Sequence, residues 1–490
     1  MQRRPERVLA LALAAGLAGC SLAPAYKAPE VPVAEQYQEH GEAYGKSWVA
    51  AEPSDQLSRD GWWKLYGDDR LDQLQQRLLK NNADLAAALA HYQQAQAFSQ
   101  QARAGLFPQV GVNANAQRDR QSDTRPLRGA TSPANYDSYT LGAEIDYEVD
   151  LWGRVRNTVE AGKDDALAAA ADLASARLSL QAQLADNYIV LRGLDQQIQL
   201  LKESIDAYQK ALELTQTRHA GGIASGLDVA RAQTQLSSAK SQWSQTQAQR
   251  ALIEHAIASL VGESASNFSV VPDTGALPLP TVPVSLPSTL LQRRPDVAAA
   301  ERRVAAANAR IGIARAAYFP SLGLSAQGGY QSDRYGGLFT APNRFWAIGP
   351  TALLTLFDAG RRKAGVEAAK AATEEAGARY RGVVLNAFQQ VEDNLAQLDH
   401  YGAARGDQKD AADAAKRSLD IAMDRYRQGA VGYLDVVQAQ TASLDAQRSL
   451  LDLDTRQLRA SVQLVRALGG GWSIDQLASE GGKPATSPAR

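Results

Sequence analysis

The side chains that most often carry out catalysis are few in this sequence and widely separated. The chain has neither the G-x-x-x-x-G-K-[ST] loop that cradles phosphate nor the H-E-x-x-H pair that binds zinc. Its only cysteine is Cys20, and its five histidines lack ligand spacing: His40, His91, His219, His255 and His400. The sequence therefore predicts no catalysis, no cofactor and no metal site.

The one cysteine has a different chemistry open to it. Residues 1–7 are basic, residues 8–18 are apolar, and small residues lead directly into Cys20. This order is typical of a secretory signal over residues 1–19, and its end resembles the lipobox of bacterial lipoproteins. The resemblance implies cleavage before Cys20, a thioether lipid on its sulfur, and acylation, for example by palmitate, of the new N-terminus. Ser21 resembles the choice for outer-membrane sorting. The alternative is an ordinary signal peptide in which the cysteine is incidental.

The bulk composition excludes several classes of protein. Mean hydropathy is −0.33 and the formal net charge is −1. No apolar run after residue 20 approaches the roughly 20 residues that a spanning helix requires. The charge provides no basic field that would attract nucleic acid. Any membrane insertion must therefore use β-strands or lipid.

Two copies of one unit make up the chain. Residues 218–233 recur as residues 425–440, at an offset of 207 (425 − 218) that also maps Gly153 onto Gly360. In each unit a helix ends at Phe-Pro, two alternating segments follow, and a long helical stretch breaks at a glycine-rich turn. Residues 360–428 contain no proline and would span roughly 100 Å as a helix. Helices this long, with small residues at spacings of three and four, indicate coiled-coil packing.

These features predict a mixed α and β membrane protein with two internal repeats. Its parts are a signal peptide (1–19), a lipid-anchored N-terminal segment with an equatorial region (20–68), repeat 1 (69–262), a proline-rich linker (263–287), repeat 2 (288–469) and a C-terminal tail (470–490). Strands are expected at about 109–118, 139–149, 321–331 and 346–357, and the long helical hairpins at 153–262 and 360–469.

The alternating segments are the membrane signal. Each is about ten residues long, the length of a tilted membrane strand, with aromatic residues near its ends. One such segment could belong to a half-buried soluble hairpin, but four in matching places of two repeats favour a membrane sheet. Open edges are not tolerated in hydrocarbon, so other copies must close the sheet. Two copies would give a filled barrel of eight strands, and three would give twelve strands with a lumen.

The mature sequence resembles the outer-membrane factors of tripartite efflux systems, in the lipoprotein branch that includes OprM and NodT. The resemblance rests on residues 62–68 (WWKLYGD), 82–85 (NADL) and 468–472 (LGGGW), and above all on a mid-chain signature. That signature comprises residues 286–296 (LPSTLLQRRPD), Ala300-Glu301, residues 307–309 (ANA), Ile311-Gly312 and residues 314–320 (ARAAYFP). From the residues alone, Arg293 and Arg294 are expected to make structural salt bridges or caps between the repeats.

The resemblance implies a TolC/OprM-like homotrimer in the outer membrane, with four strands per chain in a twelve-stranded barrel above a periplasmic helical barrel. It also implies two protein partners, a periplasmic membrane fusion (adaptor) protein and an inner-membrane pump (RND or similar). The expected function is a passive exit duct for small molecules such as drugs, and the alternative within this fold is a duct for type I protein secretion. A coiled-coil lipoprotein tether is disfavoured because a tether needs no membrane strands.

Three sets of residues follow as candidate sites. If Leu141, Ile145 and Val149 face lipid, the alternation places an acidic row in the pore, made of Glu144, Asp146 and Glu148. The helical hairpin turns are expected to dock the fusion protein, and their glycines to need positive φ. The docking residues are Gly222, Ser225, Gly226, Gly429 and Gly432.

The third set is a gate near the same turns. In OprM-like relatives a Tyr, a Leu and a carboxylate constrict the tunnel, and these positions fall on Tyr426, Leu434 and Gln438, so the acidic ring is replaced by an amide. The matching residues of repeat 1 are His219, Leu227 and Arg231. We expect an apolar constriction at Leu434, with Tyr426 and either Arg231 or Arg425 bonding neighbouring hairpins. Asp228 and Asp435 stand near the third position of their helices, which suits helix capping.

Overall fold

The computed structural model describes residues 21–31, 37–39, 61–122, 124, 129, 133–280 and 294–470. The predicted signal peptide, Cys20, the C-terminal tail from residue 471, and residues 286–293 of the mid-chain signature lie outside the described residues. The described chain is mostly helical, with four strands in one sheet, which confirms the predicted mixture of elements.

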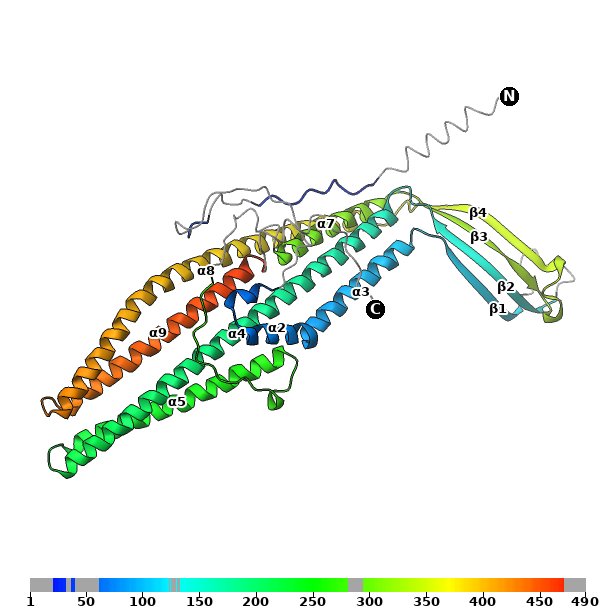
Figure 1. Ribbon diagram of the computed structural model, residues 1–490. Helices are drawn as coiled ribbons and strands as arrows, with labels where there is room; N and C mark the ends of the chain where they lie inside the picture. Colours follow the sequence, from blue (N-terminus) through cyan, green and yellow to red (C-terminus); the bar gives the residue numbers. More distant parts are fainter. Residues whose placement is uncertain are drawn as a thin grey trace. The chain divides into compact units, whose positions relative to one another are not determined.

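The order of the elements repeats once along the chain (Figure 1). The first copy contains α3 (Ala83–Ala104), β1 (Gln109–Arg120), β2 (Asn135–Glu148), α4 (Arg154–Ala220) and α5 (Gly226–Leu260). The second contains α7 (Pro295–Ala316), β3 (Ser321–Ser332), β4 (Arg344–Leu353), α8 (Arg361–Arg427) and α9 (Tyr433–Ala467). The remaining helices are α2 (Asp69–Asn81) and the short 3-10 helices η1 (Trp62–Tyr66), η2 (Ala265–Asn267), η3 (Tyr335–Gly337) and η4 (Ala341–Asn343).

The compact units of the chain cut across its two sequence repeats. Unit 1 combines Met1–Glu30, Tyr92–Ala169 and Ala299–Tyr380, and unit 2 combines Val31–His91, Ala170–Ala298 and Arg381–Arg490. Each repeat therefore contributes a strand pair and the start of its first long helix to unit 1, and the rest of its helical hairpin to unit 2. Among the described residues, no helix is both long enough and apolar enough to cross a membrane.

The long helices end in the same way in both repeats. Past the end of α4, Ile223 N donates to Arg218 O (2.8 Å), and past the end of α8, Ala430 N donates to Arg425 O (2.9 Å). The residue before each donor is a glycine with positive φ, +73° at Gly222 and +80° at Gly429. This is the Schellman pattern, in which only glycine adopts the left-handed conformation at little cost.

The sheet is antiparallel, in the order β1-β2-β3-β4 (Figure 1). Two strand boundaries differ from the sequence prediction by four residues, and the other differences are of one or two residues. Strand β2 begins at Asn135, four residues before the predicted residue 139, because it pairs with the end of β1 at Arg120. Strand β4 ends at Leu353 rather than at residue 357, because its partner β3 begins at Ser321, directly after Pro320. Proline has no N–H to extend the ladder.

Arg294 joins the start of α7 to the end of α9 within unit 2. Its guanidinium donates to Ala467 O (2.9 Å) and Gln390 Oε1 (3.0 Å), and it pairs with Asp296 (2.6 Å). Arg294 therefore makes the predicted structural salt bridge, but all of its partners lie within repeat 2 rather than between the repeats.

Candidate functional site

The register of the sheet separates its side chains into a polar face and an apolar face. Residues directly opposite each other in an antiparallel pair share a face. Ile145 lies opposite Val110 and Ala326, and Ala326 lies opposite Ile348. Glu144, on the other face, lies opposite Gly111 and Gln327.

The apolar face has no partner within the described part of the chain. Its exposed side chains include Val110 (71%), Val112 (78%), Trp346 (79%) and Ile348 (66%). A contiguous apolar surface of this kind marks a contact with membrane or protein. Because the strands are long and antiparallel, with polar residues on the opposite face, the arrangement has the pattern of a membrane strand set.

Aromatic side chains pair at both ends of this sheet. At the loop end, Tyr139 packs edge-on against Tyr335 (6.1 Å between ring centroids) and Tyr330 against Phe339 (5.5 Å). At the helical end, Trp152 stacks on Phe319 at 4.6 Å and donates its indole N–H to Pro320 O (2.8 Å). Tyr and Trp gather in this way at the two interfaces of a bilayer.

The predicted acidic row lies on the polar face of β2, but its three members differ. Glu144 and Asp146 are exposed, whereas Glu148 pairs with Arg154, which donates to it from Nε at 2.7 Å. Glu148 therefore contributes less net charge to this face than the other two acids.

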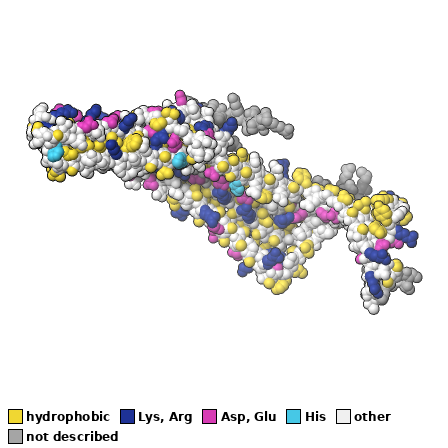
Figure 2. Space-filling view, turned by 90° about the horizontal axis from the view of Figure 1, so that it is seen from below, with side chains coloured by type: hydrophobic (Ala, Val, Ile, Leu, Met, Phe, Trp, Pro, Cys, Tyr) yellow, Lys and Arg dark blue, Asp and Glu magenta, His cyan; other side chains and the backbone are white. Residues whose placement is uncertain are grey.

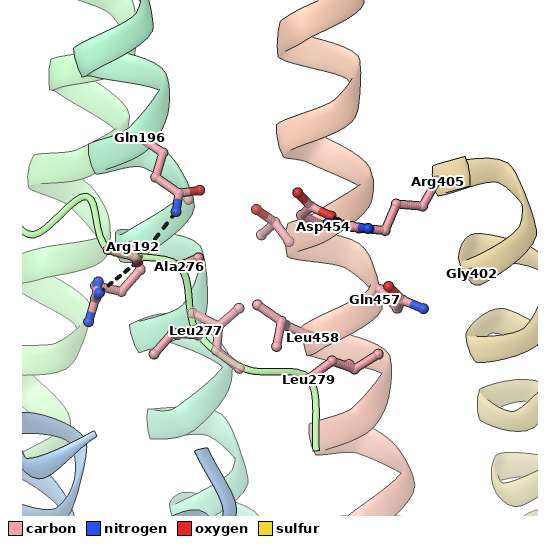
Figure 3. Close-up of a pocket in the computed structure, with 14 residues that line it drawn as sticks. Arg192, Gln196, Ala276, Leu277, Leu279, Gly402, Arg405, Asp454, Gln457 and Leu458 are labelled. Carbon is pink, nitrogen blue, oxygen red and sulfur yellow. Dashed lines mark hydrogen bonds and ion pairs between the residues drawn. The ribbon is translucent and has the colours of Figure 1, made fainter. Parts of the chain in front are cut away.

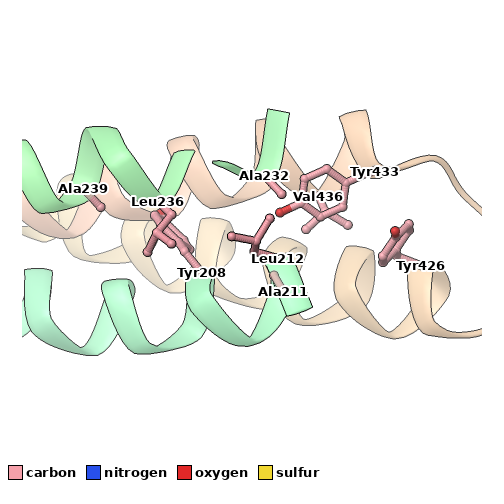
Figure 4. Packing of buried hydrophobic residues seen from close by; sticks show 9 residues of the cluster. All are labelled: Tyr208, Ala211, Leu212, Ala232, Leu236, Ala239, Tyr426, Tyr433 and Val436. Carbon is pink, nitrogen blue, oxygen red and sulfur yellow. The ribbon is translucent and has the colours of Figure 1, made fainter. Parts of the chain in front are cut away.

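The two hairpin turns lie side by side in unit 2, where α4 meets α5 and α8 meets α9 (Figure 1). A buried cluster joins all four helices just behind the turns (Figure 4). Its members are Tyr208, Ala211, Leu212, Ala232, Leu236, Ala239, Tyr426, Tyr433 and Val436.

Tyr426 is 4% exposed and connects the two hairpins. Its hydroxyl donates to Thr215 Oγ1 on α4 (3.1 Å), and its ring packs edge-on against Tyr433 at 5.2 Å. The Arg218 guanidinium lies over the same ring, 4.7 Å from its centroid, and donates to Tyr426 O. Arg218 thus bridges the two hairpins next to the turns. Arg231 instead lies 3.5 Å from Asp228 of its own helix.

The gate leucines lie away from this cluster. Leu227 is 59% exposed and Leu434 is 44% exposed, each in the first turn of its helix, and Gln438 is also exposed. An apolar side chain that is exposed in a single chain can pack against a second protein chain.

The two turns begin their second helices differently. Ser225 and Asp228 form a capping box, in which Asp228 N donates to Ser225 Oγ (3.2 Å) and Ser225 N donates to Asp228 Oδ2 (3.2 Å). This confirms the capping role of Asp228. At the matching position Gly432 has no side chain with which to cap α9. The prediction of positive φ is wrong for Gly432, whose φ is −76°, and Gly226 also lacks a positive φ.

A cavity of about 440 Å³ lies elsewhere in unit 2, between α4, the segment after Gly275, α8 and α9 (Figure 3). Its two arginines are already paired: Arg192 with Asp68 (2.6 Å) and with Gly275 O (2.8 Å), and Arg405 with Asp454. Because these charges neutralise each other, the cavity has the character of a packing gap. The described residues contain no group of three or more His, Cys, Asp or Glu that could hold a metal ion.

Charges of both signs are interspersed over the helical surface seen in Figure 2. The two distinctive surfaces are therefore the two-faced sheet of unit 1 and the exposed hairpin turns of unit 2. A sheet of this type and paired helical hairpins define the class of outer-membrane channels.

The comparisons with known proteins identify the family. The sequence model of the outer membrane efflux protein family matches residues 74–263 and 286–470. The chain is 35% identical over 469 residues to the antibiotic efflux pump outer membrane protein ArpC of Pseudomonas putida, covering 95% of this chain and 96% of ArpC. It is 34% identical, over 95% of the chain and 96% of the relative, to the toluene efflux pump outer membrane protein TtgC of Pseudomonas putida.

A solved structure agrees. The outer-membrane channel OprN superimposes with a TM-score of 0.84 at 30% identity, over 92% of this chain and 100% of that one. The chain belongs to the outer membrane efflux protein family. Its location is thus the outer membrane, and its relatives are channel and transport proteins.

Arg218 and Thr215 are bridging residues that were not predicted from the sequence. A signal for Arg218 was available, because it opens the repeated segment of residues 218–233. Thr215 lies before that segment, and no local pattern distinguishes it.

Proposed function

We propose that this protein is the outer-membrane exit duct of a tripartite efflux pump and that it conducts small molecules passively, without catalysis. The observation that carries the proposal is the open four-stranded sheet, which has one apolar face, one polar face and two edge strands, β1 and β4, each paired on one side within the described chain. An apolar face can border lipid only if its edges are closed.

Closure by three copies accounts for these edges. Four antiparallel strands per chain leave β1 and β4 running in opposite senses, so β1 of one copy can pair antiparallel with β4 of the next. Three copies give twelve strands with the polar face inward, which leaves a lumen, whereas two copies would fill it with side chains. The duct is therefore a homotrimer.

The transported class follows from the relatives. ArpC and TtgC are named for antibiotic and toluene efflux, so small organic compounds are the substrates that we assign to this duct. A polar lumen face with glycines, such as Gly111 and Gly142, provides passage without specific binding.

The partners are a periplasmic adaptor protein and an inner-membrane pump, and the hairpin turns are the docking surface. An added Cβ would meet no atom within 4 Å at Gly222 or at Gly432. The backbone at both turns is thus open to close approach. Gly432 has an ordinary φ of −76°, so its own conformation does not demand glycine.

Gly432 allows docking to be tested without damage to the fold. Gly432→Trp should abolish efflux in cells that depend on this duct, because the indole blocks the partner's approach. Gly432→Ser is the matched control, because it reproduces the capping serine found at Ser225. It should leave the free energy of unfolding unchanged or raise it by about 0.5 kcal/mol. The measurement is drug susceptibility, with the amount of assembled protein determined by native gel. Normal efflux by an assembled Gly432→Trp variant would refute docking at this turn.

The anchor is a lipid on Cys20, supported by the export signal and lipobox-like sequence before it. Several acyl chains bind a bilayer stably, whereas one binds only marginally. Cys20→Ser should eliminate incorporation of radiolabelled palmitate completely, while the sheet should still insert. Label that persists in Cys20→Ser, or that never enters the wild type, contradicts the lipid anchor.

A further inference from the structure

Part of the mid-chain signature has no role in the duct so far. Glu301, Asn308, Gly312 and Arg315 all belong to α7 and are spaced by seven, four and three residues. At 3.6 residues per turn these spacings place them on one face of the helix. None of them lines the sheet or a hairpin turn, so this face requires a separate explanation.

The first residues after Cys20 lie along that face, all within unit 1. We call residues 21–26 the strap. Asn308 Nδ2 donates to Pro24 O (2.8 Å), Arg315 Nη1 donates to Leu22 O (3.2 Å), and Tyr26 donates its hydroxyl to Glu301 Oε1 (2.5 Å). Two of the three contacts are made to strap carbonyls, and the third uses the Tyr26 side chain.

Gly312 leaves the space that the strap occupies beside α7. A Cβ at Gly312 would meet the Cβ and N of Ala23 at 2.8 Å and Asn157 Nδ2 at 2.3 Å. Real Cβ atoms do not approach other atoms so closely, so any other residue at position 312 would displace the strap from α7.

The strap ends beside the first turn of α4. Ser21 Oγ donates to Asn157 Oδ1 (2.9 Å), and Asn157 is 6% exposed. Helix α4 begins at Arg154, six residues after the end of β2. Ser21, the residue bonded to Cys20 in the sequence, is thus held at the start of α4.

We propose that Glu301, Asn308, Gly312 and Arg315 form a seat on α7 for the strap, and that this seat fixes Ser21, the residue that follows the lipid-bearing cysteine in the sequence, beside the start of α4. The mid-chain signature thereby gains a function, the attachment of the anchor-proximal segment to unit 1. The role of the lipid rests on the proposed function, whereas the seat itself rests on the contacts of residues 21–26.

Electron paramagnetic resonance of a spin label at position 25 tests the seat. Ala25 is exposed, and Ala25→Cys provides the only free thiol in a full-length protein whose Cys20 is lipidated. The label should be immobilised in this parent. Gly312→Ala should make its motion several-fold faster on the nanosecond scale, because the added methyl group expels Ala23.

Gly365→Ala is the matched control, since the same substitution in α8 meets no atom within 4 Å. It should leave the spectrum unchanged. Tyr26→Phe provides a second variant, which alters the strap alone and should also mobilise the label. Equal mobility in the parent, Gly312→Ala and Tyr26→Phe proteins would overturn the seat. If the spin label also reacts with protein that retains Ala25, Cys20 has a free thiol and the lipidation is contradicted. The seat is not contradicted by that result, because the difference in label mobility between Gly312→Ala and Gly365→Ala would remain.

Discussion

Leu434→Ala should raise the resting conductance of the channel several-fold. Leu434 lies in the first turn of α9 with 44% of its surface exposed, and its counterpart Leu227 is 59% exposed. We propose that in the trimer these leucines cover their exposed surface against one another across the axis. Leu434→Ala removes one isopropyl group from each of the three chains. The apolar constriction becomes wider, and its energy barrier to water and ions is lowered.

Gln438→Ala is the matched control for the gate. Gln438 lies one turn further along the same face of α9 and is exposed, so its truncation shortens a side chain without removing an apolar contact. Conductance should change little. If both variants, in trimers of verified integrity, conduct as the wild type does, the constriction lies elsewhere in the chain.

The Tyr426 contacts would support a gate at the turns. Tyr426, Thr215 and Arg218 tie α8 to α4 directly behind the turns, so the leucines are held on a packed four-helix base. The neutral hydrogen bond from Tyr426 to Thr215 contributes about 1 kcal/mol to that base.

The second large effect concerns ion preference. Converting Glu144 to Gln together with Asp146 to Asn should abolish most of the preference for cations over anions in the open channel. The two carboxylates are exposed on one face of β2, about 7 Å apart along the strand. This spacing is within a Debye length at physiological salt, so their fields add and three copies form an acidic ring.

Glu148→Gln serves as the comparison, because Glu148 is already paired with Arg154. It changes the net charge by one unit per chain rather than two, so it should lower the preference for cations less than the double change does. The measurement is the reversal potential in a salt gradient. An anion-preferring wild type, or a double variant that retains full cation preference, would show that the acidic row does not face the lumen.

The sequence was most informative where the structure depends on local periodicity. Alternation of Ile145 with Glu144 is enough to assign the two faces of β2, because side chains in a strand alternate by geometry. The repeat at an offset of 207 (425 − 218) likewise located both glycine-rich turns, since positive φ at Gly222 and Gly429 has a clear residue signature.

Features that depend on long-range contacts could not be predicted in this way. The end of β4 at Leu353 is determined by where β3 begins, and Arg218 meets Tyr426 across 208 residues of sequence. The contact of Pro24 with Asn308 spans 284 residues. No local pattern in either partner encodes such a pairing.

The most direct test of the exit-duct proposal is the current carried by the purified full-length protein in planar lipid bilayers. The account predicts discrete, long-lived conductance steps, small for the wild type and larger for Leu434→Ala, as expected of a closed ring of twelve strands around a lumen. The exit-duct proposal would be contradicted if assembled protein inserts into the bilayer but produces no conductance steps, even in the Leu434→Ala variant.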